Sequence, residues 1–287
     1  MDLEPEGIVP PDSDVAVGND PAVREIERLL ESGKIEEGLL AIDAAMAAGR
    51  GNSADLTFLR GDACLGLGLA REAEREFRSV LQGDPDCPSS RCWLAMSLYL
   101  QWRFDEAEAA VAAARALPDA LVDADVVAAC LLERKGDYRE ADGLFERAAT
   151  ASPDKYSVPV RMLRDEFDRE VQEAVGALPP QFQGYLDQVP VIVQELPDAA
   201  FARSDANTDA DILSPDMLGL FDGTPIVDEA DSEVSAGPSK IYLFQRNLER
   251  MATGRENLVE QIRITLWHEL GHYLGFEEDD MGRLGLE

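Results

Sequence analysis

Apolar residues recur at helical spacing from about residue 21 onward, and the pattern repeats every 34 residues. Three segments align at this period: GLAREAEREF (68–77), WRFDEAEAAV (102–111) and GDYREADGLF (136–145). Each contains an alanine followed four positions later by a larger apolar residue: Ala73 and Phe77, Ala107 and Val111, Ala141 and Phe145. A small residue lets two helices approach closely, and the larger residue fills the space beside it. The pattern therefore predicts a run of paired helices, one pair per repeat.

A fourth, weaker repeat precedes these three. In GKIEEGLLAI (33–42), Gly38 occupies the alanine position. Together the repeats cover residues 21–155 and resemble the tetratricopeptide repeat family, although they lack its usual Trp-Leu-Gly-Tyr consensus in the first helix. The resemblance implies an all-α solenoid whose groove binds a protein partner. The alternative is that the repeats only pack against the rest of the chain.

The period disappears after residue 155, where helical and strand-like segments mix. Residues 160–178 are amphipathic with helical spacing and are followed by Pro179 and Pro180, which predict a helix that ends there. Two runs rich in β-branched and aromatic residues predict strands: VPVIVQEL (189–196) and KIYLFQRNL (240–248). In LGLFDGTPI (218–226), Asp222 and Gly223 predict a turn. This half of the chain is therefore expected to be α+β.

The last predicted helix is TGRENLVEQIRITLWHELGHYLG (253–275), which contains both histidines of the chain. Thr253 and Glu256 have the spacing of a capping box, so the helix is expected to start near Gly254. Four residues form one apolar stripe: Leu258, Ile262, Leu266 and Leu270. The histidines fall on roughly the opposite side, which is the reverse of what two core histidines would show.

Within this helix, His268 and His272 are one turn apart on the same face, so both imidazoles can reach one zinc ion. Glu269 directly follows the first histidine and is positioned to take a proton from a water that zinc activates. Gly275 permits a left-handed turn that returns the chain toward the metal. Beyond it lie several candidate third ligands: Glu277, Glu278, Asp279 and Asp280. The alternative is that two polar residues fell near one end of a helix by chance.

The second half of the chain resembles the minimal zincin-like metallopeptidases, a bacterial family of small domains with the pattern HExxHxxGxxD. The resemblance spans residues 160–280 and includes residues 178–197, 218–226 and 239–250 as well as the histidine helix. It implies a small zincin fold, bound zinc and peptidase activity. His268 and His272 match the histidine ligands, and Glu269 matches the base. The acidic third ligand falls on Glu278, where the pattern has Asp, so neighbouring Asp279 stays open as the second choice.

The remaining parts of a peptidase site are less well marked. Three residues are candidates for the donor that stabilises a developing oxyanion: Tyr242, Arg246 and Tyr273. Tyr273 is expected to pack in the core, whereas Tyr242 is equally suited to facing the cleft. By the same resemblance, KIYLF (240–244) is expected to be the edge strand that aligns an extended peptide substrate.

Composition restricts the partners and the compartment. The 287 residues carry a net charge of −31, which disfavours nucleic acid and anionic membrane surfaces as partners. Residues 1–20 lack the features of a signal peptide and read as a disordered acidic leader. The four cysteines show no CxxC spacing, and buried free thiols are expected. A cytoplasmic protein without a membrane-spanning segment is the simplest interpretation.

These observations predict a multidomain chain with an acidic leader (1–20), an all-α tetratricopeptide solenoid (21–155) and a small α+β zincin-like domain (156–287). The predicted function is a zinc-dependent metallopeptidase with Glu269 as general base, acting on a peptide or protein substrate that the repeats recruit. The alternative is a non-catalytic interaction protein in which zinc has a structural role.

Overall fold

The structure, a computed structural model, describes residues 20–186, 188–202, 213–226 and 238–276. These residues form two compact units. The repeat unit contains residues 20–156, 199–202 and 213–215. The C-terminal unit contains residues 157–186, 188–198, 216–226 and 238–276. The predicted acidic leader lies outside the described residues except for Asp20, whose side chain accepts a hydrogen bond from the Ala22 N–H and caps the first helix.

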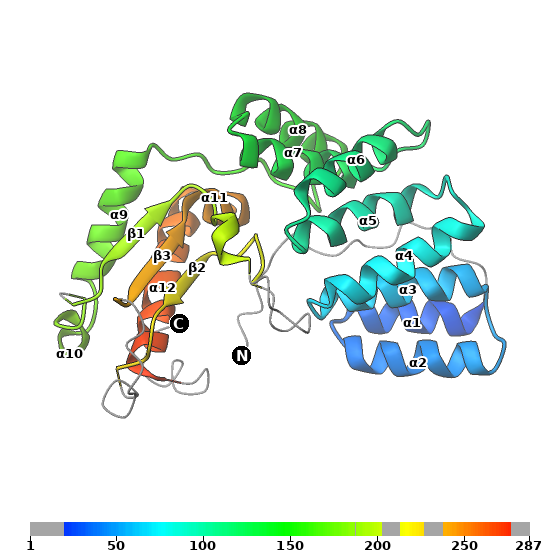
Figure 1. Ribbon diagram of the computed structural model, residues 1–287, viewed down its shortest axis with the longest axis horizontal. Helices are drawn as coiled ribbons and strands as arrows, with labels where there is room; N and C mark the ends of the chain where they lie inside the picture. The colour runs from blue at the N-terminus through cyan, green and yellow to red at the C-terminus, as the bar shows by residue number, and fades with distance from the viewer. Residues whose placement is uncertain (1–19, 187, 203–212, 227–237, 277–287) are drawn as a thin grey trace. The chain divides into compact units, whose positions relative to one another are not determined.

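In the described part of the repeat unit, consecutive helices form four pairs that follow one another in chain order (Figure 1). The pairs are α1 (Pro21–Glu31) with α2 (Ile35–Ala47), α3 (Ser53–Gly66) with α4 (Ala70–Gly83), α5 (Pro88–Leu100) with α6 (Phe104–Arg115), and α7 (Asp123–Lys135) with α8 (Tyr138–Ala151). A short 3-10 helix, η1 (Ala199–Phe201), belongs to the same unit. The first pair is the weaker repeat expected at the front of the solenoid.

The repeat alanines mark the helix crossings, as the 34-residue period predicts. Ala73, Ala107 and Ala141 lie near the start of the second helix of their pairs and are 0% exposed. Gly38 has the same place in α2, and an added Cβ there would collide with the side chain of Leu30. The full burial of the alanines and the close approach at Gly38 both favour a small side chain at these positions.

Three of the four cysteines are buried free thiols, as expected. Cys64, Cys92 and Cys130 lie inside the first helices of their pairs, whereas Cys87 is half-buried at the start of α5. Burial raises the pKa of the Cys64 thiol to about 11, so this thiol stays protonated at neutral pH. The expectation of burial is therefore wrong for Cys87, because this residue precedes the helix and faces partly outward.

The C-terminal unit packs helices against a small sheet. Its described helices are α9 (Arg164–Gly176), α10 (Pro180–Gln183), α11 (Gln245–Met251) and α12 (Arg255–Leu274), and its described strands are β1 (Val191–Gln194), β2 (Gly219–Asp222) and β3 (Lys240–Phe244). The strand order is β1-β3-β2, with β1 parallel and β2 antiparallel to β3 (Figure 1). Phe167 of α9, Ile241 of β3 and Leu266 of α12 share one buried core. This half is α+β, as predicted.

The structure shortens three predicted elements, and the strand expected over residues 189–196 covers only Val191–Gln194. The helix expected over residues 160–178 begins only at Arg164, because the preceding residues bind α11 through their backbone: Val160 N–H donates to the Glu249 carbonyl at 2.9 Å. The strand expected over residues 240–248 ends at Phe244, and α11 follows directly. A β-branched and aromatic pattern ends with Phe244, so the helix-forming residues QRNL were wrongly included in the strand.

A further correction concerns the position of β3 in the sheet. The segment KIYLF was expected to form an edge strand, but β3 pairs with β1 on one side and β2 on the other. Its backbone hydrogen-bonding groups are therefore used within the sheet, and β3 is not available to align a peptide. Among the described strands, β1 and β2 form the edges.

Candidate metal centre

The histidines lie in the last turns of α12, whose ends are set by local chemistry. The helix begins at Arg255, one residue after the predicted start, but the predicted capping box does not form. Instead, the side chain of Asn257 accepts a hydrogen bond from the Thr253 N–H at 3.0 Å. At the other end, Gly275 adopts a left-handed conformation with φ 78°, and its N–H donates to the His272 carbonyl. The predicted glycine turn after the second histidine is confirmed.

The predicted apolar stripe anchors α12 in the core. Leu258, Ile262, Leu266 and Leu270 are all 0% exposed. His268 and His272 are half-buried on the other side of the helix, whereas Thr265 of that side is buried against β2. The side of α12 opposite the apolar stripe is therefore partly covered by β2, one of the two edge strands. This places β2 beside the histidines.

The two imidazoles point toward a common position. Nε2 of His268 and Nε2 of His272 are 3.1 Å apart, and the ring planes are nearly perpendicular at 88°. Two Zn–N bonds of about 2.05 Å at a tetrahedral angle would place the nitrogens about 3.3 Å apart. The observed separation is close to this value, so the pair fits two ligand positions of one zinc ion without a change of the helix backbone.

Glu269 lies beside the histidines but is directed at the edge strand. Its side chain is 8% exposed, and Oε2 accepts a hydrogen bond from the backbone N–H of Phe221 at 2.6 Å. The Phe244 N–H of β3 donates to the Leu218 carbonyl at 2.9 Å. In an antiparallel pair the hydrogen-bonding residues alternate, so around β2 the even-numbered residues bond to β3 through their backbone. The N–H of Phe221, an odd-numbered residue, therefore points away from β3. The contact thus joins the proposed base to the outer edge of β2.

Gly219 of β2 was not singled out by the sequence analysis, yet it determines how closely α12 approaches. An added Cβ at this position would lie 2.7 Å from Thr265 Cγ2, 2.8 Å from Glu269 Cγ and 2.9 Å from Glu269 Oε1. Side chains are not tolerated at such distances without movement of the neighbours. The available signal was a glycine within a short apolar strand, which often marks the close approach of another element.

The residues predicted as the third zinc ligand lie outside the part of the chain that the structure describes. Both predicted candidates, Glu278 and Asp279, belong to residues 277–287, outside the described residues. Within the described ranges, no group of three or more His, Cys, Asp and Glu side chains is close enough to hold a metal ion. Among the described residues, the predicted metal site therefore consists of the two histidine nitrogens alone.

The three candidate oxyanion donors have other contacts. Ile241 and Leu243 pack in the core with α12, so strand alternation directs Tyr242 to the opposite face of the sheet, away from the histidines. Tyr273 is 3% exposed and its ring lies 5.7 Å from the ring of Phe221, which confirms the expected packing role. Arg246 forms ion pairs with Glu249 at 2.8 Å and Glu195 at 3.1 Å.

The fold and the histidine helix define a helical repeat protein joined to a small zincin-type domain. A family model described as zincin-like metallopeptidase matches residues 186–286. A tetratricopeptide repeat model matches residues 23–86 and 65–120. The chain therefore joins tetratricopeptide repeats in its N-terminal half to a zincin-like metallopeptidase domain. A search of curated proteins finds no match.

The described helices also bear on membrane association. None of the helices that the structure describes is both long enough and apolar enough to span a lipid bilayer. The longest described helix, α12, has charged residues through its length and two histidines near its end.

Proposed function

We propose that this chain is a zinc-dependent peptidase in which His268 and His272 hold the metal and Glu269 is the general base. The observation that supports this most directly is the 3.1 Å separation of the two histidine Nε2 atoms. The carboxylate of Glu269, the residue after His268, is held beside them by the edge of β2. A purely structural zinc site has no need for a carboxylate there and is more often closed by four protein ligands.

The roles of the residues follow from this arrangement. Bound zinc supplies Lewis acidity and activates water for attack at neutral pH. Glu269 accepts the proton of the attacking water and later donates it to the leaving amine. The N–H of Phe221 holds the Glu269 carboxylate in a fixed orientation for both transfers. Glu278 is the preferred third ligand and Asp279 the second choice, on the resemblance to the HExxHxxGxxD pattern.

The substrate is proposed to be an extended peptide that aligns with β2 in place of β3. The backbone N–H and carbonyl of Gly219 and the carbonyl of Phe221 point away from β3, on the edge that adjoins Glu269, whereas the Phe221 N–H already donates to Glu269. A peptide added to such an edge gains main-chain hydrogen bonds that do not depend on its side chains. The specificity of cleavage would then come from side-chain contacts around the strand.

The repeat unit is proposed to recruit the substrate or a partner protein. Its solenoid of four helix pairs is the kind of surface that other repeat proteins use for binding peptides. In this proposal, residues 21–155 supply recognition and residues 156–287 supply chemistry. Binding energy from the repeats would compensate for a small catalytic domain with few contacts of its own.

The decisive experiment compares Glu269→Gln with the parent chain. Both proteins are loaded with zinc and incubated with a mixture of synthetic peptides, and new termini are detected by mass spectrometry. We expect cleavage by the parent, and a loss of at least about 100-fold in the variant, because general-base catalysis contributes about 10²- to 10⁴-fold. Zinc per chain should remain unchanged.

Glu256→Gln is the matched control, because Glu256 is an exposed carboxylate in the first turn of the same helix. It should retain full activity. Cleavage that survives Glu269→Gln would eliminate this mechanism. Zinc binding without any cleavage by the parent would favour the alternative, in which the repeats carry the function and zinc stabilises the terminal helix.

A further inference from the structure

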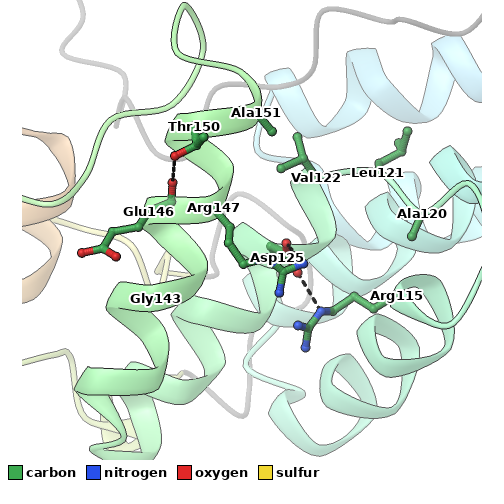
Figure 2. A pocket seen from close by; sticks show the side chains of 10 residues that line it. All are labelled: Arg115, Ala120, Leu121, Val122, Asp125, Gly143, Glu146, Arg147, Thr150 and Ala151. Atoms are coloured by element: carbon green, nitrogen blue, oxygen red, sulfur yellow. Dashed lines mark hydrogen bonds and ion pairs between the residues drawn. The ribbon is translucent and has the colours of Figure 1, made fainter.

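A pocket of about 630 Å³ is lined by residues of the repeat unit. It is formed by the end of α6, the connector that follows it, the first turn of α7 and one face of α8 (Figure 2). This volume is in the range of sites that bind small molecules. Neither the peptidase proposal nor the repeat pattern assigns a role to it.

The polar part of the pocket is a pair of arginines that share one carboxylate. Arg115 Nε donates to Asp125 Oδ1 at 2.8 Å, and a terminal nitrogen of Arg147 lies 2.8 Å from Asp125 Oδ2. The Asp125 side chain is only 8% exposed, whereas those of Arg115 and Arg147 are 36% and 63% exposed. Asp125 is thus a buried anchor that holds two accessible guanidinium groups side by side.

The pocket lining carries two arginines and two carboxylates, Asp125 and Glu146. Two guanidinium groups outnumber the single carboxylate between them, and Figure 2 shows the Glu146 side chain directed away from this cluster. The whole chain carries a net charge of −31. The cluster of two arginines and Asp125 is therefore a locally positive part of a negative protein, and it attracts a small anion, while the surrounding negative charge repels a large polyanion.

Guanidinium groups offer five N–H donors each in a planar fork that matches a carboxylate. The described contacts with Asp125 use one nitrogen of each arginine, so both retain donors for a ligand. Beside them, Leu121 and Val122 supply an apolar wall. An anionic head and a short aliphatic body are the features that such a lining recognises.

We propose that this pocket binds a small aliphatic carboxylate, with its carboxylate on Arg115 and Arg147 and its alkyl group against Leu121 and Val122. The repeat unit would then carry a small-molecule site independent of zinc and of peptide hydrolysis. Gly143 of α8 also lines the pocket, and an added Cβ at this position meets no atom within 4 Å. A larger side chain at this position can therefore fill the pocket without disturbing the helix.

The test is isothermal titration calorimetry of the full chain with isovalerate as the probe. We expect saturable binding that weakens about tenfold or more in Arg147→Gln, through loss of charge-assisted hydrogen bonds. Gly143→Leu should also abolish binding, whereas Gly143→Ala should retain it. Arg139→Gln, an exposed arginine on the same helix outside the pocket lining, is the matched control and should bind like the parent.

Three further probes separate the sources of the carboxylate. Acetyl-leucine presents the carboxyl end of a peptide, leucinamide lacks the carboxylate, and inorganic phosphate lacks the alkyl group. Isovalerate binding at least as tightly as acetyl-leucine supports a free small ligand. Tighter binding of acetyl-leucine, equal binding of phosphate or leucinamide, no binding of isovalerate, or unchanged binding in Arg147→Gln and Gly143→Leu would each overturn the proposal.

Discussion

The carboxylate of Glu269 on α12 accepts a hydrogen bond from the backbone N–H of Phe221 on β2, at 2.6 Å. These residues are 48 positions apart, and the bond fixes the candidate base against the strand that we propose aligns the substrate. The 8% exposure of Glu269 keeps water from competing strongly for this contact. The relationship between base and strand is therefore part of the fold and does not depend on a bound ligand.

Gly219→Ala should disturb this relationship. The new methyl group would lie within 3 Å of Thr265 and of two atoms of Glu269, so the helix or the carboxylate must move. We expect destabilisation of about 1–3 kcal/mol, typical of overpacking, together with a loss of peptidase activity. The measurements are chemical denaturation and the initial rate on the peptide found to be cleaved. Zinc content should be unchanged, because the histidines are not displaced by a shift of the Glu269 side chain.

Gly176→Ala is the matched control for this prediction. Gly176 ends α9 in the same unit, and an added Cβ there meets no atom within 4 Å. The exchange should leave activity unchanged and stability equal or slightly higher. Full activity in Gly219→Ala would show that β2 and α12 separate easily, and that the contact between Glu269 and Phe221 is dispensable.

The third zinc ligand can be identified by comparing Glu278→Ala with Asp279→Ala. On the present proposal, Glu278→Ala loses zinc, whereas Asp279→Ala retains about one zinc per chain. The loss follows because two imidazoles alone leave a tetrahedral ion without its charged protein ligand. Elemental mass spectrometry after dialysis gives zinc per chain directly, with His272→Ala as the reference for a broken site.

A reversed result, with zinc lost only in Asp279→Ala, would move the ligand by one residue and leave the rest of the proposal intact. No zinc in the parent after incubation with excess metal would contradict the site itself. In that case the repeats would become the main candidate for the function of the chain.

The features that the sequence predicted well depend on short spacings. The alanines at Ala73, Ala107 and Ala141 mark helix crossings because each acts within its own pair of helices. His268 and His272 converge because one turn of helix determines their separation. Local geometry of this kind can be inferred from residue types and their period alone.

The features that the sequence did not reveal depend on pairing between distant segments. The central position of β3 results from its pairing with β1 and β2, which nothing in KIYLF specifies. Likewise, the role of Gly219 follows from an α12 that crosses it closely. Such contacts are selected by the whole fold, so a local pattern does not determine them.

Glu249→Ala should destabilise the C-terminal unit. This carboxylate is 0% exposed, forms ion pairs with Arg161 at 3.0 Å and Arg246 at 2.8 Å, and accepts a hydrogen bond from the Met162 N–H at 3.0 Å. Its removal leaves two arginines and a backbone donor without their main acceptor, which should cost about 3 kcal/mol. Hydrogen exchange measured by mass spectrometry should show faster exchange around residues 160–162.

The control for this effect is Glu260→Ala, which removes an exposed partner of Arg263 on α12. It should change stability by less than about 1 kcal/mol, as is typical of surface pairs. Equal effects of the two exchanges would mean that the buried network does not hold the segment before α9 in place.

Asp62 in α3 should make the stability of the repeat unit depend on pH. The residue is 8% exposed, and burial raises its pKa to about 7, although the charge of Lys155 acts in the opposite direction. Between pH 4 and 7 the folded protein therefore holds a proton that the unfolded chain has lost, so the free energy of unfolding falls as pH rises. Asp62→Asn removes this dependence and should be the more stable form at pH 8.

The difference in the free energy of unfolding between Asp62→Asn and the parent is expected to shift by about 3 kcal/mol in favour of the variant between pH 5 and pH 8. Below the pKa of Asp62 in the folded protein, the shift is about 1.4 kcal/mol per pH unit. Urea denaturation followed by tryptophan fluorescence measures it, since Trp93 and Trp102 both belong to the repeat unit. Working above pH 5 keeps the protein away from its isoelectric point near 4.3. The control is Asp43→Asn, at an exposed site on α2, and its free energy of unfolding should follow the same pH dependence as that of the parent. If the free energy of unfolding of Asp62→Asn has the same pH dependence as that of the parent, the buried carboxyl does not retain its proton between pH 5 and 7. Lys155 must then compensate its charge fully.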